Sequence, residues 1–188
     1  MIPLAAVIVA LVCAAASARR VWFAANATAL HPADIDAALG KAQGPEALER
    51  LRALVAQLPD ADWERDLLEA LSAAPDVRAA LVNEQLTELD YRIQRWQRVP
   101  RVCASIATSF GFMLATLVLR KGLADTGEVP VEVGELVLRG LVGDALTVGA
   151  MGIVGTAFCI AAQGEAKRIA KARIAGADKL VERLEGLV

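Results

Sequence analysis

Histidine and cysteine are scarce in this chain of 188 residues, which argues against several kinds of chemistry. His31 is the only histidine, and the three cysteines, Cys13, Cys103 and Cys159, form no CxxC pair. Metal centres and Cys/His catalytic pairs need such residues in clusters, and no motif supplies a nucleophile with its base. We therefore expect no enzymatic activity, no metal and no cofactor, and we interpret each cysteine as a small apolar residue within a helix.

A basic excess and strand patterns are also missing. The formal net charge is -2, which gives no electrostatic footprint for nucleic acid, so no nucleic-acid partner is expected. Aromatic residues make up only 4% of the chain, and β-branched residues form no alternating runs. The pattern is typical of helices.

Apolar residues are abundant and are segregated from charge. They reach 56% of the chain, with a mean hydropathy of +0.45, although charged residues still make up 22%. A soluble domain rarely combines these values, and here the long apolar runs lie near the two ends with most of the charge between and after them. We therefore predict an all-α integral membrane protein with three transmembrane helices. The expected segments are a first transmembrane helix at 1–23, a cytoplasmic helical domain at 24–101, a second transmembrane helix at 102–119, a short periplasmic loop at 120–135, a third transmembrane helix at 136–163 and a cytoplasmic C-terminal helix at 164–188.

The first apolar run, Ile2 to Ala18, has two interpretations. Ala16-Ser17-Ala18 resembles the cleavage site of a signal peptide. However, no basic residue precedes the run, whereas Arg19 and Arg20 follow it, so we favour a short membrane span.

Lysine and arginine flank the predicted spans unequally. Three lie on the predicted outer side, at Arg120, Lys121 and Arg139. The bias predicts a periplasmic N-terminus and a cytoplasmic C-terminus in a multi-pass protein of the bacterial inner membrane. The inner side carries nine: Arg19, Arg20, Arg95, Arg98, Arg101, Lys167, Arg168, Lys171 and Arg173.

Prolines divide the central region into helices. Helices are expected to begin at Pro32, at Gly44-Pro45 and at Pro75, because proline fits the first helical turn. The last of these helices should run toward the membrane with one apolar stripe. That stripe comprises Val77, Leu81, Leu86, Leu89, Ile93 and Trp96.

Asp144 is the most informative residue of the third span. An aspartate at the centre of a span costs ~2.5–3.5 kcal/mol on insertion scales, so it must face protein or water. One interpretation is an ion or proton path. The other is that the span begins later, near Leu141, and Asp144 lies at the interface or pairs with Arg139.

Small and hydroxyl-bearing residues mark both C-terminal spans. Ser105, Thr108, Ser109 and Thr116 share one helical face, where they line a hydrated path or bond their own backbone and allow close packing. The third span is rich in small residues, which predicts a bundle and an oligomer. These are Gly140, Gly143, Ala145, Gly149, Gly152, Gly155 and Thr156.

Three features together resemble the TolQ/ExbB/MotA family of proton-channel subunits of membrane motors. The first is the predicted topology. The second is the stretch Gly143–Gly152, which is similar to the family's pattern of a small residue, an acid, Ala-Leu and a small-residue helix. The third is the charged helix leading into Ile106-Ala107-Thr108-Ser109. The chain departs from the family at Gly149 and Phe158, where the family has threonine and proline, so it resembles a divergent member.

The resemblance implies a function and its partners. It implies a homopentamer in the lipid bilayer around a pore that holds a single-span partner of the ExbD/TolR/MotB type, with proton flow driving work at the cell envelope. Asp144 would be the pore acid. Thr147, Thr108, Ser109 and Thr116 would be the polar pore lining. The alternative is a non-conducting oligomeric scaffold or adaptor.

Overall fold

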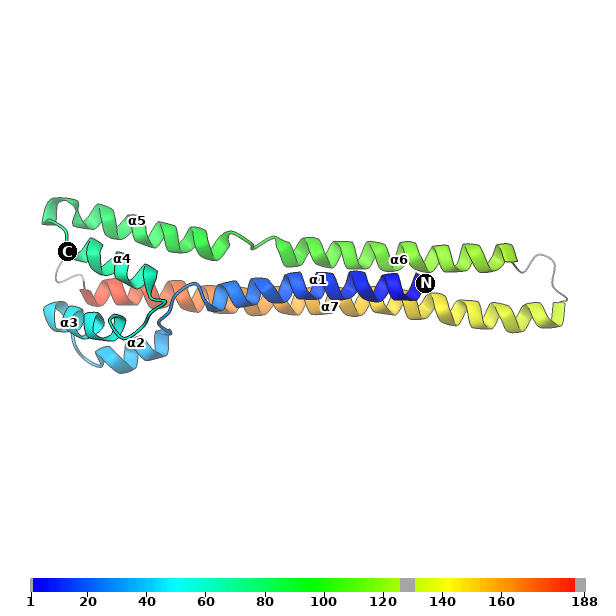
Figure 1. Ribbon diagram of the computed structural model, residues 1–188, viewed down its shortest axis with the longest axis horizontal. Coiled ribbons are helices and arrows are strands. Elements are labelled where there is room, and N and C mark those ends of the chain that lie inside the picture. Colours follow the sequence, from blue (N-terminus) through cyan, green and yellow to red (C-terminus); the bar gives the residue numbers. More distant parts are fainter. Residues whose placement is uncertain (1, 126–130, 185–188) are drawn as a thin grey trace. The chain divides into compact units, whose positions relative to one another are not determined.

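Every regular element that the structure describes is a helix (Figure 1). The computed structural model describes the backbone of residues 2–125 and 131–184, with the side chains of 2–124 and 139–184. The helices are α1 (Ile2–Ala25), α2 (Pro32–Leu39), α3 (Gly44–Val55), α4 (Asp62–Leu71), α5 (Pro75–Gln94), α6 (Val99–Asp125) and α7 (Val131–Leu184).

Three stretches are long and apolar enough to cross a membrane. They lie in Ile2–Ala25, in Pro75–Ala124 and in Arg139–Leu184. The predicted all-α class is therefore confirmed, as are three helices that could span a membrane, which we call the spanning helices. Within the expected loop at 120–135, α6 continues to Asp125 and α7 begins at Val131, and residues 126–130 lie outside the described part.

The chain divides into two compact units, and α1 and α7 contribute to both. The spanning unit comprises Met1–Val21 with Gln97–Glu165. The helical unit comprises Trp22–Trp96 with Ala166–Val188.

Leucines from four helices form the core of the helical unit. Leu39, Leu51, Leu67 and Leu180 are each at most 1% exposed and belong to one apolar cluster. At about 25 cal/mol per Å² of apolar surface, burial of each such side chain contributes roughly 1.5–3 kcal/mol. The helix starts at Pro32, Gly44 and Pro75 agree with the sequence prediction, and in each helix a proline occupies one of the first two positions.

The predicted stripe of α5 is wrong at both ends. Leu89 and Ile93 are buried as expected, but Val77 and Trp96 are 45% and 44% exposed. The helix ends at Gln94, and α6 begins only at Val99. Pro100 lies in the first turn of α6 and has no amide to donate to the carbonyl four residues earlier, at Trp96, which disfavours a continuous helix through residues 95–98.

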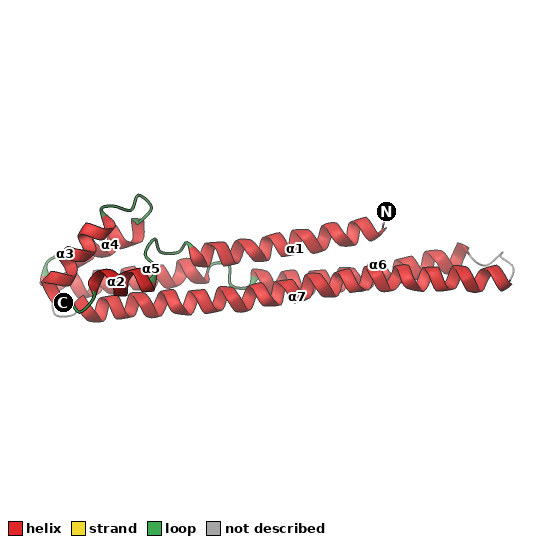
Figure 2. Cartoon of the chain, turned by 90° about the horizontal axis from the view of Figure 1, so that it is seen from below, coloured by secondary structure: helices red, strands yellow, loops and turns green. Residues whose placement is uncertain are grey.

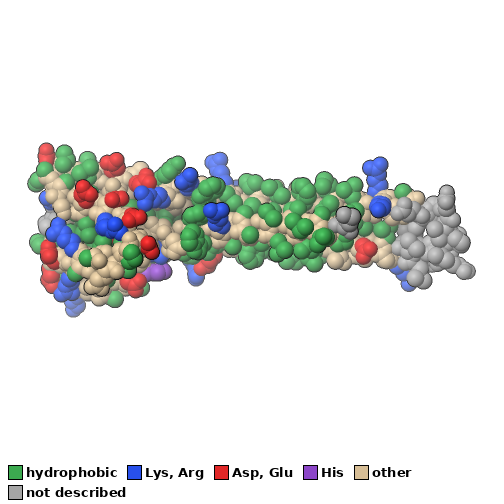
Figure 3. Space-filling view, viewed as in Figure 1, with side chains coloured by type: hydrophobic (Ala, Val, Ile, Leu, Met, Phe, Trp, Pro, Cys, Tyr) green, Lys and Arg blue, Asp and Glu red, His purple; other side chains and the backbone are tan. Residues whose placement is uncertain are grey.

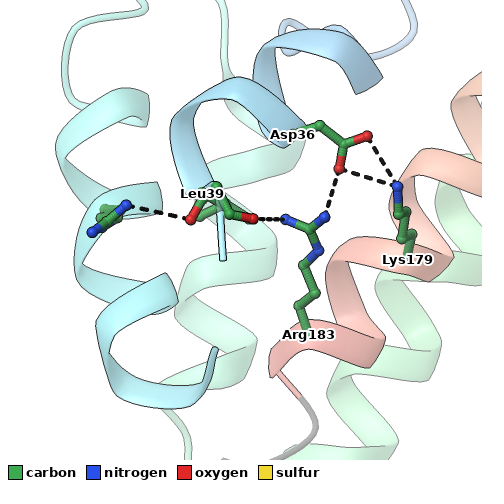
Figure 4. A network of polar contacts seen from close by, with 6 residues as sticks. Asp36, Leu39, Lys179 and Arg183 are labelled. Atoms are coloured by element: carbon green, nitrogen blue, oxygen red, sulfur yellow. Dashed lines mark hydrogen bonds and ion pairs between the residues drawn. The ribbon is translucent and has the colours of Figure 1, made fainter. Parts of the chain in front are cut away.

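An ionic network joins α2 to the end of α7 within the helical unit (Figure 4). The Asp36 carboxylate accepts from Lys179 Nζ at 3.0 Å and from Arg183 at 2.8 Å. The hydrogen bonds from Lys179, with the charges of Lys179 and Arg183, hold the pKa of Asp36 below its usual range. The group is exposed, so the network orients α2 and is not a major source of stability.

A buried arginine anchors the segment between α1 and α2. Arg173 of α7 is 5% exposed and donates to the hydroxyl of Thr28 at 2.7 Å and to the carbonyls of Ala25 and Leu30. Glu64 is also buried and accepts from the Leu30 amide at 2.9 Å. Arg173 is therefore a structural residue, whereas its position in the sequence had indicated only a flanking positive charge.

Candidate functional site in the spanning unit

Close backbone contacts fix the register of α6 against α7. The two helices lie side by side in both ribbon views (Figures 1 and 2). A Cβ added at Gly111 would meet the Gly152 Cα at 2.8 Å, and Gly122 lies against Leu141. Since residue numbers rise along α6 as they fall along α7, the pair is antiparallel. Of the third-span glycines predicted to allow close helix packing, Gly152 does so in this contact.

Helix α1 runs parallel to α7 within the same unit. Gly155 lies against Ala10, and the thiol of Cys159 donates to the Cys13 carbonyl at 3.6 Å. Near the start of α1, Ala6 packs with Ala145 and Val148. Hydrophobic side chains dominate the visible face of these spanning helices (Figure 3).

Asp144 lies on an exposed part of α7 and has no ion-pair partner among the described residues. The pairing with Arg139 considered from the sequence is therefore not formed. Its neighbour Ala145 is buried against α6, which places Asp144 beside the helix contact and not within it. A carboxylate in this position is available to water, to another helix or to a second subunit.

The register also gives the depth of Asp144. Leu141 contacts Gly122, so Asp144, three residues further along α7, is level with Leu119 of the antiparallel α6. Leu119 is the last residue of the apolar run that begins at Val102. Asp144 therefore lies at the end of the apolar layer that precedes Arg120, and not at its middle.

Two tiers of hydroxyl groups follow further along the spanning helices. Thr147 and Thr116 are level with each other, about one turn from Asp144, and both are exposed. Each donates to its own backbone, to Gly143 O and Met113 O respectively. The second tier contains Ser109, which is exposed, and Thr108, and it lies roughly 18 Å along α7 from Asp144 at 1.5 Å per residue.

Thr108 is committed to the contact between α6 and α7. Its hydroxyl lies 2.6 Å from that of Thr156, so one of the two donates to the other, and both lie within hydrogen-bonding distance of Ala104 O, at 3.0 and 3.2 Å. The structure thus brings Thr108 together with Thr156, which the sequence had indicated only as a small residue. No hydrogen bond among the described residues joins Asp144 or Thr147 to the predicted hydroxyls of α6.

The three cysteines, one from each spanning helix, meet in one cluster. Cys13 is 4% exposed and Cys159 is fully buried. Cys103 packs against the apolar cluster that contains Cys13. The described side chains include no group of three or more Cys, His, Asp or Glu that could hold a metal ion. The cluster is therefore a packing contact that joins three helices.

This cluster provides a test of the register. In a Cys159→Ser background, a mild oxidant should link Cys13 to Cys103, because both side chains belong to one packing contact. With a protease site inserted at Pro59–Asp60, the two fragments should then remain joined on a non-reducing gel. Cys103→Ser is the control and should release them. Release from the chain that retains both cysteines would contradict the placement of α1 against α6.

The comparisons with known proteins give no relative: the chain matches no family model, no curated protein and no solved structure.

Proposed function

We propose that this chain is a pore-forming subunit of a proton-driven motor in the bacterial inner membrane, with its N-terminus periplasmic and its C-terminus cytoplasmic. The observation that carries the proposal is Asp144, an acidic side chain on a spanning helix that is exposed and unpaired. Lipid is an unfavourable environment for such a group. In the proposed pore, another helix or a hydrated path covers this side chain.

The tiers of hydroxyl groups support a path that begins at Asp144. Thr147 and Thr116 follow within one turn, and Ser109 lies deeper on α6. Threonine and serine hydroxyls both donate and accept hydrogen bonds, so they stabilise water in a narrow channel. In this arrangement Asp144 is the acid at the outer mouth of the path. Thr108 does not face the path in this arrangement; through its hydrogen bond with Thr156 it holds together α6 and α7, the helices that carry the path.

Open glycines support an oligomer. A Cβ added at Gly140, Gly143 or Gly149 would meet nothing within 4 Å, although Gly111 and Gly152 are closely packed. Small residues on a free helix face allow a neighbouring helix to approach closely in lipid. We propose that this face of α7 contacts adjacent subunits, five in number by the resemblance to motor subunits. The pore would hold a single-span partner with an intramembrane acid.

The position of Asp144 also favours a second candidate function. Because it is level with Leu119, at the end of the apolar run, its carboxylate can reach the headgroup region without a pore. The chain would then be a non-conducting oligomeric scaffold. Its open glycines would mediate assembly, and the helical unit would recruit partners.

One experiment separates these two functions. The purified chain should form a pentamer in native mass spectrometry. It should also conduct protons in vesicles when it is co-expressed with a short single-span protein encoded beside it. A pentamer that carries no proton flux with such a partner would favour the scaffold. A stable monomer or dimer would contradict both the pore and the motor.

A further inference from the structure

The connection between α5 and α6 presents three arginines to its surroundings. Arg95, Arg98 and Arg101 recur at steps of three, and each is exposed. Trp96, which lies between the first two, is 44% exposed. We propose that this segment, Arg95–Arg101, binds the headgroups of anionic phospholipids; we call it the arginine connection.

The arginine connection differs from three exposed arginines of the helical unit in lacking acidic partners. In the helical unit, Arg50, Arg52 and Arg65 each pair with an acid three or four residues away, at 2.6, 3.0 and 3.3 Å. Among the described residues, no acid pairs with an arginine of the connection.

The sequence explains this lack of partners. The chain has no acidic residue between Asp90 and Asp125. The nearest acid in the sequence, Asp90, already accepts from Gln94 Nε2 at 2.7 Å. The three positive charges therefore remain for an anion that the chain does not supply.

The location identifies the anion. Val102, directly after the connection, begins an apolar run whose large side chains are exposed, with Ile106 41% and Phe110 42% exposed. Such a surface is suited to acyl chains. Headgroup phosphates of the same lipids would lie at its edge, beside the arginines. A soluble phosphate would use the charge but not the apolar surface.

Residue chemistry fits a phospholipid at this edge. The planar guanidinium group binds phosphate oxygens through paired hydrogen bonds, which an ammonium group does not reproduce. The Arg95 guanidinium lies 5.7 Å from the centre of the Trp96 ring. Tryptophan is enriched at membrane interfaces because it has an apolar body and a polar N–H. Trp96 thus also reports on the bound lipid.

Lipid preference at Trp96 tests the proposal. The full chain is reconstituted with brominated phosphatidylglycerol or brominated phosphatidylcholine, and quenching of Trp96 fluorescence is obtained as the difference from Trp96→Phe. Unaltered protein should prefer the anionic lipid. Each basic residue near an anionic surface contributes about fivefold in binding. We therefore expect the preference to fall at least fivefold in the variant Arg95→Gln/Arg98→Gln/Arg101→Gln.

A matched variant removes the same charge elsewhere. Arg50→Gln/Arg52→Gln/Arg65→Gln should keep the preference, because these arginines pair with acids of the chain. An equal fall in both variants, or an unchanged preference in the first, would overturn the proposal.

Two measurements on unaltered protein do not depend on the folding of any variant. Salt at about 1 M shortens the electrostatic screening length to ~3 Å and should abolish the preference for the anionic lipid. Inorganic phosphate at constant ionic strength should not compete. A salt-independent preference, or displacement by free phosphate, would contradict a headgroup site.

Discussion

Asp144→Asn should abolish proton-coupled work, to below about a tenth of the unaltered rate, while assembly remains nearly intact. The amide is isosteric with the carboxylic acid and is cheaper to place in an apolar layer than the charge. It cannot take up and release a proton at physiological pH. Because Asp144 makes no ion pair in the described structure, its replacement leaves no stranded partner.

The measurement is paired: oligomer yield from native mass spectrometry, and proton flux in vesicles containing the single-span partner. Asp178→Asn is a suitable control, since Asp178 is also exposed on α7 but lies in the helical unit. It should change neither quantity. Normal flux in Asp144→Asn would remove the pore-acid assignment and favour the scaffold. A loss of oligomer before any loss of flux would assign Asp144 to assembly.

Substitutions in the hydroxyl tiers should lower proton flux less than Asp144→Asn does in the same assay. Thr147→Val removes one exposed hydroxyl next to Asp144, and water can take its place. Thr108→Val tests helix packing as well as the path, because the Thr108 hydroxyl is hydrogen-bonded to Thr156 between α6 and α7. A defect in Thr108→Val accompanied by lower stability would therefore reflect packing.

Local signals in the sequence predicted the helices of the helical unit well. Helix starts at Pro32, Gly44 and Pro75 depend on backbone geometry within a single turn, which the sequence displays directly. The wrong prediction that Trp96 continues the buried stripe of α5 also has a local origin. Periodicity continued the stripe past Gln94, although Pro100 has no amide to donate to the carbonyl of Trp96, four residues earlier.

Tertiary register could not be read from the sequence. The meeting of Cys13, Cys103 and Cys159 depends on how far each helix is shifted along its neighbours, and three isolated cysteines carry no such information. The depth of Asp144 was ambiguous for the same reason. The sequence allowed several starting points for the third span, whereas the contact of Gly122 with Leu141 selects the level of Leu119.

The structural role of Arg173 did leave a signal in the sequence. Ala166, Arg173, Ala177 and Leu180 are buried at steps of three, four and seven along α7. An arginine at an apolar position of such a stripe predicts a buried donor that needs acceptors. Assignment by charge alone placed it among the residues that flank the membrane.

Gly152→Ala should weaken the packing of α6 against α7 and lower the stability of the spanning unit. The added Cβ would lie 2.8 Å from the Gly111 Cα and 2.9 Å from the Ala107 carbonyl oxygen. Both are backbone atoms, so no side chain can rotate away. The helices must separate, and the contact between Thr108 and Thr156 at 2.6 Å would lengthen with them.

Gly149→Ala supplies the matched control for this prediction. It lies three residues away on the same helix, and its added Cβ would meet nothing within 4 Å. Both variants gain the same helix propensity, so that gain cancels in the comparison. Overpacking of a tight contact typically costs about 1–3 kcal/mol. Gly152→Ala should therefore unfold in detergent with a free energy lower by that amount than Gly149→Ala.

Gly149→Ala separates packing within the chain from packing between chains. Its stability in the dissociated state should match the unaltered protein. If α7 contacts adjacent subunits through its open glycines, Gly149→Ala should shift the oligomer toward smaller species, because the methyl group would face the neighbour. Equal stability of Gly152→Ala and Gly149→Ala would contradict the close approach of α6 and α7, and with it the register that places Asp144 at the mouth of the path.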